Sequence, residues 1–516
     1  MVMIITGEEA VKKIHSGDNI CITGNLNLLE PETILYEMEK SFLKNKTPSN
    51  LSIFTPVFIG NKEGHGFDYF SHTGMVKRIV SGSYVSMGPN KKMNDLIFNN
   101  EVEAYNIPMG SFYSLLRASG ANNPGLFTKV GLNTFFDPRQ NGGRLNSITK
   151  NDIVQIQNID GDEWLFYPKL KIDVSIIRGT STDEFGNISL ENEPTSQGVF
   201  STALAAKANG GIVIAQVKRK VKNGSIHPKL VTVPNFMVDY VVIDEREDDD
   251  VLDNKESTYS NIRQIVDKKE KMELTHRKAI LRRIAMELNK GDLVNIGFGI
   301  TGGLAEIAVE ENFINDIIFS TEHGSVGGVP GWTGVFGVAM NPDVILDSNS
   351  VFDMYTAGLL NITCLGMGQV DNHGNVNNHK FSNMIAGCGG FNDIIYKTKT
   401  ICFGGTFTAG GLETEIKNGQ IKILKEGKHK KFLPEIEGVT FNAKNALKIG
   451  QRVLYVTERC VFELHNQGLK LIEIAPGISL EKDILKSLDF EIEIDENLKL
   501  MDSRIFNEEP MGIEIK

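Results

Sequence analysis

The sequence GDLVNIGFGITGGLAEIAVEE, residues 291–311, decides the fold. Its apolar run at 293–296 is typical of a buried strand, and the glycine-rich segment that follows leads into LAEIAVEE, whose apolar spacing predicts a helix. Before it, Thr275 is placed to cap another helix, which has one apolar face formed by Ile280, Ile284 and Leu288. Helices that alternate with short apolar strands are typical of α/β proteins.

The same order of elements occurs near the start of the chain. Thr6 and Glu9 fit a capping box, which predicts a helix that ends at Gly17-Asp18. The run 19–22 then predicts a strand, and Pro31 is placed to start the next helix. The Gly-Asp pairs at 17–18 and 291–292 are 274 residues apart, which suggests that the chain contains a duplication.

Two further pairs of segments follow in the same order. Gly186-Asn187 follows an apolar strand, as does Gly374-Asn375, 188 residues later. Gly210-Gly211 precedes the strand IVIAQV, and Gly389-Gly390, 179 residues later, precedes FNDIIY, which we therefore expect to match that strand. The first half therefore carries roughly 90 additional residues, which we place within 55–150. We expect two related open α/β domains with mostly parallel sheets and flanking helices.

Length and composition agree with this organisation. A chain of 516 residues exceeds what one core supports, so two or more domains are expected. A net charge of -11 argues against general nucleic-acid binding. The five cysteines form no CxxC pair, which argues against a disulfide framework or a cysteine zinc site. With no leader-like start and no apolar run of about 18 residues, we expect a cytoplasmic protein.

The boundary between the halves is predicted from charge. The segment 244–257, DEREDDDVLDNKES, is acidic and poor in apolar residues, which is typical of a surface linker. We expect an N-terminal domain over 1–250, an acidic and helical linker over 251–274, and a C-terminal domain over 275–516. Within the last of these, Asn418-Gly419 predicts a hairpin and RVLYVTERCVFEL predicts two further strands.

The main candidate for chemistry is Glu322, in the stretch IIFSTEHGSVGG at 317–328. It follows an apolar run and precedes a glycine-rich loop. Gly297, Gly299 and Gly302 form a GxGxxG, and Glu322 falls 20 residues after Gly302, so the pair fits a dinucleotide site with the acid on the ribose. A structural glycine turn with a surface carboxylate is a second interpretation, and a nucleophilic carboxylate is a third.

Glycines on both sides of a carboxylate favour the nucleophile. They leave the side chain open to a ligand and let backbone N–H groups point inward. The cluster Gly387-Cys388-Gly389-Gly390 is a possible source of such donors. A carboxylate that attacks a thioester carbonyl creates an oxyanion, and each N–H donor placed for it contributes about 2.7–4 kcal/mol. Glutamate is a poor nucleophile in water, so desolvation and positioning have to activate it.

Other candidates are weaker. Asp371, His373 and His379 match no standard metal spacing, and Asp-Asn-Gly loops are ordinary turns, so no metal site is expected. Cys388 is more often a small filler residue than a nucleophile. The run that contains Lys425, Lys428, Lys430 and Lys431 is typical of a solvated face, with contact to the phosphates of an anionic ligand as the alternative.

Taken together, these blocks resemble the family I CoA-transferases, specifically the fused single-chain type that acts on short-chain acyl-CoA and acetate or propionate. The resemblance covers almost the whole chain. It rests on EAVKKIHSGDNICITGN, FSHTGMVKRIVSGSY, EAYNIPMGS, TKVGLNTFFDPR, RGTSTDEFGNIS, VDYVVID, STEHGSVGGVPG, GQVDNHGNVNNHKF, GCGGFNDI, FGGTFTAGGLETEI and YVTERCVFEL.

The resemblance implies a function for the site. Glu322, with Gly324 in the family's Glu-x-Gly pattern, is expected to form a covalent γ-glutamyl-CoA thioester with ping-pong kinetics. The family's pattern further implies catalytic support from Gly389, Gly390 and Asn377, coenzyme A contacts at Gly387 and Gly405, and an acyl pocket that contains Gly24, Asn25 and Met109. Coenzyme A is then a substrate, and no tightly bound cofactor is expected. The GxGxxG becomes a turn.

The resemblance also concerns the chain as a whole. The two domains would be a fused pair of α-like and β-like subunits, of which only the second keeps the reactive glutamate, and the protein would be a homo-oligomer, a dimer or tetramer. Close relatives have glutamine where this chain has Met109, so the acyl preference is expected to differ. An acyl-CoA hydrolase that uses the same glutamate, and a non-catalytic nucleotide-binding protein that uses GFGITGG, are the alternatives.

Overall fold

A computed structural model describes residues 2–26, 28–60, 64–84, 91–244, 263, 271–331, 336–382 and 384–515. Contacts divide the chain into two units. Unit 1 comprises Met1–Ile262, Ile345–Phe352 and His379–Asp393, and unit 2 comprises Arg263–Val344, Asp353–Asn378 and Ile394–Lys516. Most of the predicted linker 251–274 lies outside the described residues. No helix of the described part is long and apolar enough to cross a membrane.

Unit 1 is built on a parallel sheet. Its main strands are β1 (Met3–Ile4), β2 (Asn19–Ile22), β3 (Leu51–Thr55), β4 (Val76–Ser81), β5 (Glu103–Asn106), β9 (Val174–Thr182), β11 (Ile212–Lys220) and β13 (Tyr240–Ile243). They run in the order β1-β13-β11-β9-β2-β3-β4-β5, and every neighbouring pair is parallel. Strand β9 is buried along its whole length, as expected for the centre of a parallel sheet.

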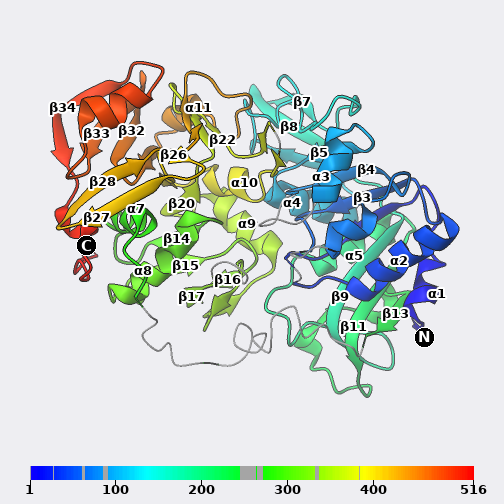
Figure 1. Cartoon of the computed structure of the whole chain (residues 1–516). Coiled ribbons are helices and arrows are strands. Elements are labelled where there is room, and N and C mark those ends of the chain that lie inside the picture. The colour runs from blue at the N-terminus through cyan, green and yellow to red at the C-terminus, as the bar shows by residue number, and fades with distance from the viewer. Residues whose placement is uncertain are drawn as a thin grey trace. The chain divides into compact units, whose positions relative to one another are not determined.

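Helices pack against this sheet (Figure 1). The first begins with the predicted capping box, because Thr6 Oγ1 accepts from Glu9 N while Glu9 Oε2 accepts from Thr6 N. Helix α5 packs on β9 and β11. The helices of unit 1 are α1 (Gly7–Val11), α2 (Glu32–Asn45), α3 (Lys91–Phe98), α4 (Met109–Gly120) and α5 (Val199–Ala208); its short strands are β10 (Ile188–Ser189), β12 (Val231–Val233), β23 (Lys380–Phe381), β24 (Met384–Ile385), and a separate sheet of β6 (Gly125–Thr128), β8 (Asp162–Pro168) and β7 (Gln155–Ile159).

Unit 2 has a mixed sheet with a parallel centre. Its strands are β14 (Leu293–Ile296), β15 (Ile318–Ser320), β16 (Ser325–Val326), β19 (Val344–Ile345), β20 (Ile362–Gly366), β25 (Thr400–Gly404), β31 (Arg452–Val456), β32 (Cys460–His465), β33 (Gly468–Ile474) and β34 (Glu493–Leu500). The order is β19-β16-β15-β14-β20-β25-β31-β32-β33-β34. The pairs from β15 to β31 are parallel, and β16 and β32 add antiparallel neighbours.

Helix α7 packs on β25 and β31 and contacts α8 (Figure 1). Thr275 occupies its N-cap position as predicted, although the side chain makes no capping hydrogen bond. The helices are α7 (His276–Ala285), α8 (Leu304–Glu310), α9 (Ser348–Ala357), α10 (Phe391–Ile395) and α11 (Ala443–Lys448), of which α9 and α10 are divided between the units; the short strands are β17 (Val329–Pro330), β18 (Ala339–Met340), β21 (Gln369–Asp371), β22 (Val376–Asn377), β26 (Thr408–Ala409), β27 (Glu413–Lys417), β28 (Gln420–Lys425), β29 (His429–Lys430) and β30 (Phe432–Leu433).

Strand register confirms the duplication. The central order β15-β14-β20-β25-β31 repeats β3-β2-β9-β11-β13. Val294 lies opposite Ile362 as Ile20 lies opposite Val174. Thr400 lies opposite Ile362 as Ile212 lies opposite Val174. The additional residues of unit 1 lie between β3 and β9, a stretch that includes most of the predicted interval 55–150 and extends beyond it to 173.

The third pair of matched segments was wrong. Residues 391–395 form helix α10, and the strand that matches β11 is β25, which begins at Thr400. A short apolar run after glycines has no periodicity that separates a strand from a buried helix. The other local predictions are confirmed: β31 and β32 form, and Asn418 and Gly419 join β27 to β28 with φ of 55° and 72°, as a type I′ turn requires.

Candidate active site

Glu322 lies in the turn that joins β15 to β16, at the carboxyl end of a parallel strand. Thr321 N donates to Ser325 O at 2.9 Å, and Gly324 N donates to Thr321 O at 3.1 Å. Gly324 has φ of 126°, a backbone conformation that favours glycine. The carboxyl ends of parallel strands are where α/β proteins bind ligands, so the turn places Glu322 in the usual location for a reactive group.

The Glu322 carboxylate is buried without a charged partner. The residue is 8% exposed, and Oε2 accepts no hydrogen bond from the described residues. Burial raises the pKa of Glu322 to about 7, while its own backbone N–H and the Asn295 amide act to lower that pKa. A buried carboxylate that forms no ion pair is costly, and such groups occur mainly at functional sites.

His323, the residue after Glu322, is uncharged and packs against aromatic rings. His323 is buried, and burial lowers its pKa to about 3, so the imidazole is neutral at physiological pH. Its ring meets Phe336 edge-to-face at 6.4 Å, and Phe336 meets Phe298 in the same way at 5.2 Å. A Cβ on Gly337 would lie 2.1 Å from the His323 ring, so glycine is required there.

Four buried polar side chains lie behind the turn. Asn295 of β14 donates to Ser320 O at 3.2 Å and to Tyr355 Oη at 3.3 Å, and accepts from Thr363 Oγ1 at 3.1 Å. The hydroxyl of Tyr355 also hydrogen-bonds with Ser320 Oγ. Nothing in the sequence pairs these four residues, because the hydrogen-bonded partners are 25 to 68 positions apart.

The predicted GxGxxG forms a turn. Gly297 N donates to Cys364 O at 2.8 Å, and Ile300–Gly303 form one turn of 3-10 helix, η4, that continues into α8.

The glycine cluster 387–390 belongs to unit 1 and is fixed by hydrogen bonds. Gly387 N donates to His379 O at 2.8 Å, Cys388 N to Asn106 Oδ1 at 3.0 Å, and Gly389 N to Gly82 O at 2.8 Å. The Gly389 N–H is therefore already used. In the described part of the chain, the buried N–H of Gly390 donates to no acceptor, so it is the cluster's available backbone donor.

The predicted acyl-pocket residues also lie in unit 1. Met109 is 1% exposed, begins α4, and donates its N–H to Gly389 O at 2.9 Å, so it is attached directly to the glycine cluster. Asn25 is buried, and its N–H donates to Leu28 O at 2.9 Å. Gly24 has φ of 136°, and a Cβ there would lie 2.4 Å from the Glu30 side chain.

The remaining predicted contacts lie in unit 2. Asn377 is buried on β22, and its amide donates to Gln369 Oε1 at 2.9 Å. Gly405 follows β25 and donates its N–H to Val456 O at 3.1 Å. A Cβ on Gly405 would lie 2.7 Å from Lys431 Nζ. Burial lowers the pKa of Lys431 to about 8, so this lysine of the predicted basic run differs from an ordinary solvated one.

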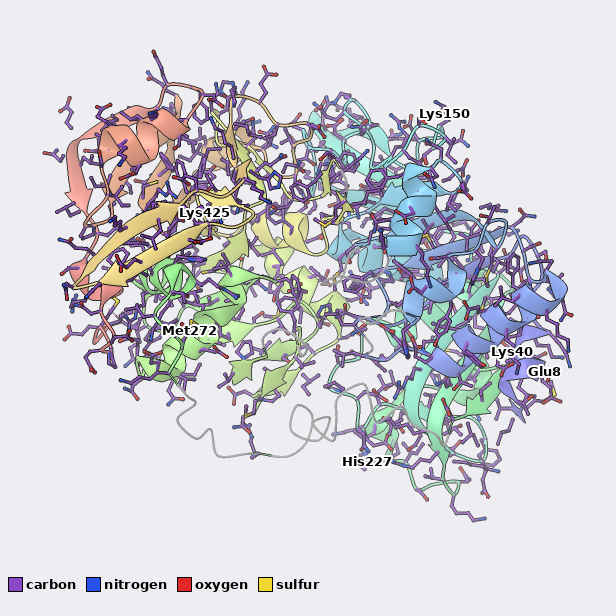
Figure 2. All side chains as sticks on the ribbon, in the orientation of Figure 1. Glu8, Lys40, Lys150, His227, Met272 and Lys425 are labelled. Carbon is purple, nitrogen blue, oxygen red and sulfur yellow. The ribbon has the colours of Figure 1, made fainter. Side chains whose placement is uncertain are left out.

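The weaker candidates have structural roles. Burial raises the pKa of the Cys388 thiol well above its usual value, which opposes a nucleophilic thiolate. Asp371 Oδ1 accepts from the N–H groups of His373 and Asn375, as in an ordinary turn. Lys425, labelled on β28 in Figure 2, pairs with Glu413 at 2.6 Å. Among the described residues, no group of three or more metal-ligating side chains is present.

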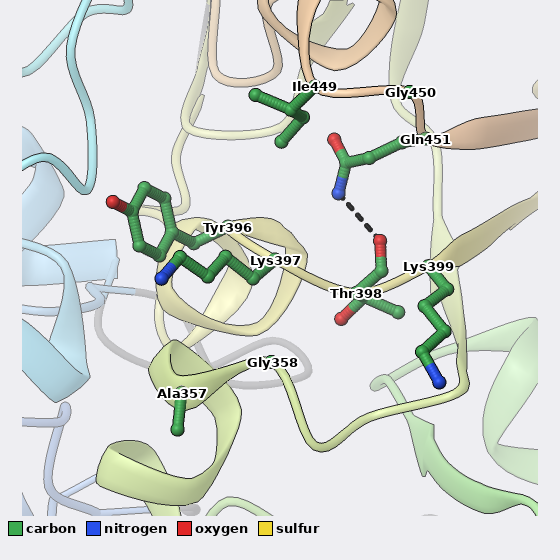
Figure 3. A pocket seen from close by; sticks show the side chains of 9 residues that line it. All are labelled: Ala357, Gly358, Tyr396, Lys397, Thr398, Lys399, Ile449, Gly450 and Gln451. Atoms are coloured by element: carbon green, nitrogen blue, oxygen red, sulfur yellow. Dashed lines mark hydrogen bonds between the residues drawn. The ribbon is translucent and has the colours of Figure 1, made fainter.

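A separate pocket lies at the opposite end of the unit 2 strands. Its volume is about 460 Å³, and it is lined by residues that precede β25 and β31 and by the end of α9 (Figure 3). Gln451 donates across it to Thr398 O at 2.7 Å. The pocket touches the amino ends of these strands, whereas Glu322 follows the carboxyl end of β15, so it is not the site around Glu322.

Known proteins match this chain along its length. Residues 4–244 match the family model described as coenzyme A transferase. The acetate CoA-transferase YdiF of Escherichia coli O157:H7 is 38% identical over 99% of this chain and 96% of its own, and its apoenzyme crystal structure superposes with a TM-score of 0.93 over 100% and 98% of the two chains. A caffeate CoA-transferase of Acetobacterium woodii is 39% identical over 100% and 99%.

A second structure of the E. coli enzyme, described as a thioester complex with CoA, matches with a TM-score of 0.91 at 38% identity, and covers 100% of this chain and 98% of its own. Full-length identity at this level goes beyond a shared fold. The chain therefore belongs to the coenzyme A transferases, as a single-chain enzyme of family I.

Proposed function

We propose that the protein moves CoA between a short-chain acyl-CoA and a free carboxylic acid, such as acetate or propionate, by a ping-pong reaction through a γ-glutamyl-CoA thioester on Glu322. The observation that carries this proposal is the buried Glu322 carboxylate at the end of β15, without an ion pair and with an unsatisfied Oε2. The thioester complex of the E. coli relative supports it.

The first half-reaction takes two steps. A Glu322 oxygen attacks the thioester carbonyl of the acyl-CoA, the C–S bond breaks, and a mixed anhydride forms as the CoA thiolate leaves. The thiolate then attacks the Glu322 carbonyl, which releases the free acid as its carboxylate and leaves the glutamyl-CoA thioester. An acceptor carboxylate reverses the two steps, so a new acyl-CoA forms and Glu322 returns.

Burial prepares Glu322 for the first step. A carboxylate in water is stabilised by hydration, which reduces its reactivity, whereas burial leaves the Glu322 carboxylate poorly solvated. With a pKa of about 7, roughly half of the molecules carry the ionised form at neutral pH. The uncharged His323 supplies no cation that would stabilise the ground state of the carboxylate.

Each attack creates an oxyanion that requires donors. We assign the N–H of Gly390 as one donor, because the N–H groups of Gly387, Cys388 and Gly389 are already bonded to other acceptors. Asn377 is assigned to support the thioester, Gly387, Gly405 and Lys431 to contact CoA, and Gly24, Asn25 and Met109 to line the acyl pocket. One oxyanion donor of this kind lowers the activation barrier by about 2.7–4 kcal/mol.

Peptide mass spectrometry tests the proposal. The protein is mixed briefly with acetyl-CoA, propionyl-CoA or butyryl-CoA without an acceptor and quenched in acid. A CoA adduct on the peptide that contains Glu322, discharged by an added acid with its acyl-CoA appearing, supports the transferase. Discharge by water at the same rate, with no effect of the added acid, would favour the hydrolase alternative. The absence of an adduct with all three donors would contradict both.

The same proposal extends to the whole protein. We propose a cytoplasmic homo-oligomer, a dimer or tetramer, in which residues 1–250 act as the α-like half, 251–274 as the linker and 275–516 as the β-like half, with CoA as substrate and no tightly bound cofactor. Light scattering coupled to size exclusion measures the oligomeric state. The absorbance and mass of the purified protein show whether a cofactor is tightly bound.

A further inference from the structure

Tyr355 lies close to Glu322 but has no part in the reaction described above. It belongs to the last turn of α9, is 0% exposed, and shares hydrogen bonds with Ser320 and Asn295. Its ionisation is coupled to the charge of Glu322, which acts to raise the Tyr355 pKa in addition to the larger effect of burial. The hydroxyl is therefore neutral in the working pH range and lies within the electrostatic reach of the carboxylate.

The Asn295 amide has two N–H groups and three nearby acceptors. Its orientation is fixed because Oδ1 accepts from Thr363 Oγ1 at 3.1 Å. Nδ2 then donates to Ser320 O at 3.2 Å and to Tyr355 Oη at 3.3 Å, which uses both N–H groups. The third acceptor is the Glu322 carboxylate, whose pKa a hydrogen bond from the same amide acts to lower, so three acceptors share the two N–H groups, and Oε2 accepts no hydrogen bond from the described residues.

We propose that Tyr355 is a positioning residue for Glu322: its hydroxyl competes with the carboxylate for the N–H groups of Asn295, and so keeps the nucleophile under-solvated. This inference rests on the proposed role of Glu322. The hydroxyl itself is held by Ser320 Oγ, two residues before Glu322 on the same strand end. Removing it frees one N–H of Asn295 for Glu322, and a hydrogen bond to the ionised carboxylate lowers both its pKa and its nucleophilicity.

The titratable groups that face this arrangement are few. From its own turn, Glu322 has His323, which burial keeps neutral. From α9 it has Tyr355, whose pKa is raised. The influences on the Glu322 pKa are burial, its own backbone N–H and the neutral Asn295 of β14. A change in the Asn295 hydrogen bond is therefore the direct way in which Tyr355 alters the ionisation of Glu322.

The test compares Tyr355→Phe with Tyr455→Phe. Tyr455 is also 0% exposed, lies on β31 of the same sheet, and donates to Gly374 O, so Y455F removes an equivalent buried hydroxyl away from Glu322. Quench-flow mass spectrometry follows formation of the CoA adduct from acyl-CoA between pH 5 and 9. For Y355F we expect the acid-limb midpoint to fall by about one pH unit and the rate above it to fall about tenfold. Y455F should leave the midpoint unchanged.

A midpoint and rate in Y355F equal to those of the wild type would overturn the inference. Equal shifts in Y355F and Y455F would also overturn it, because they would reflect a general loss of packing. Infrared titration of the Glu322 carboxyl, taken as the difference from Glu322→Gln, gives a readout that does not require turnover. If the wild type forms no adduct, the proposed function fails, and this titration still determines whether Tyr355 raises the Glu322 pKa.

Discussion

Glu322 and His323 are consecutive buried residues whose pKa values burial shifts in opposite directions, to about 7 for the carboxyl and to about 3 for the imidazole. Each shift favours the neutral form, so the two side chains do not form an ion pair. Histidine is ordinarily the residue that titrates near neutral pH, but in this pair the glutamate does. The pH response of the site should therefore be that of a single carboxyl group.

Activity should show one acid limb with a midpoint near pH 7. The reason is that attack requires the ionised carboxylate, and the pKa of Glu322 is about 7. The measurement is kcat/KM for acyl-CoA against pH in the free enzyme. Replacement of His323 by glutamine should leave this midpoint close to its wild-type value, and a midpoint near pH 4.5 would contradict the burial argument.

Glu322→Gln should stabilise the protein at high pH while abolishing adduct formation. Because the pKa of Glu322 in the folded protein, about 7, lies above its ordinary value of 4.5, the wild type loses stability as pH rises between these values. The loss is complete above pH 7 and amounts to about 3 kcal/mol at most. Urea unfolding of both proteins at pH 5 and pH 8 measures it. A stability difference between them that does not increase with pH would contradict the prediction.

Asp393→Ala should destabilise unit 1 through the start of α4. The buried Asp393 carboxylate accepts from Gly110 N and Ser111 Oγ, both at 2.9 Å, in the first turn of that helix. Loss of these acceptors leaves buried donors unsatisfied and should cost about 1–3 kcal/mol in the free energy of unfolding. Asp393→Asn, which retains one acceptor oxygen, should cost less. Equal losses in the two variants would contradict this account.

Arg282→Ala should release the C-terminal residues from α7. The buried guanidinium donates to Asn507 O at 2.6 Å and to Glu509 O at 2.9 Å, and it lies 3.4 Å from Glu311. Removing one member of a buried ionic group costs about 3–5 kcal/mol. Hydrogen exchange of 505–511 and thermal unfolding report the loss. Lys430→Ala, which breaks the exposed pair with Asp489, should cost about 1 kcal/mol or less.

Met109→Gln should shift the acyl preference towards acetate. Met109 is flexible, apolar and 1% exposed beside the glycine cluster, so it suits a longer alkyl chain. A glutamine there adds a polar group that an alkyl chain leaves unsatisfied. We expect the ratio of kcat/KM for acetate to that for butyrate to rise about tenfold. Equal ratios in the parent and the variant, measured with acetate, propionate and butyrate, would contradict the assignment.

Local signals in the sequence predicted much of the fold. The Gly-Asp and Gly-Asn pairs mark chain reversals beside buried strands, so β2, β9, β14 and β20 could be predicted from them, whereas the register in which these strands pair is seen only in the structure. The match of FNDIIY to a strand was wrong because so short a segment fits a helix turn and a strand equally well. Only its packing decides between the two. The capping box at Thr6 succeeded because both partners lie within three residues of each other.

The site could be predicted only as far as the chemistry of single residues allows. Glu322 was identifiable because it combines a strand end with flanking glycines. Tyr355 was not, because an apolar helix position predicts burial but not that the hydroxyl meets Ser320 and Asn295. Similarly, the glycine cluster 387–390 does not reveal in the sequence which of its N–H groups is already hydrogen-bonded. The N–H of Gly389 donates to Gly82 O, more than 300 residues away, and that of Gly390 stays available.

Unit 1 contains two segments that are synthesised late, Ile345–Phe352 and His379–Asp393. Gly82, Asn106 and Met109 are synthesised early, but their hydrogen-bond partners in 379–393 follow only after much of unit 2 has been made. Asp393 is 131 residues beyond Ile262, which at ~5–20 residues per second is a delay of roughly 7 to 26 s. During that interval unit 1 lacks residues 379–393, so their hydrogen-bond partners at Gly82, Asn106 and Met109 cannot be paired with them. A nascent chain arrested before Asp393 should therefore remain sensitive to protease in unit 1.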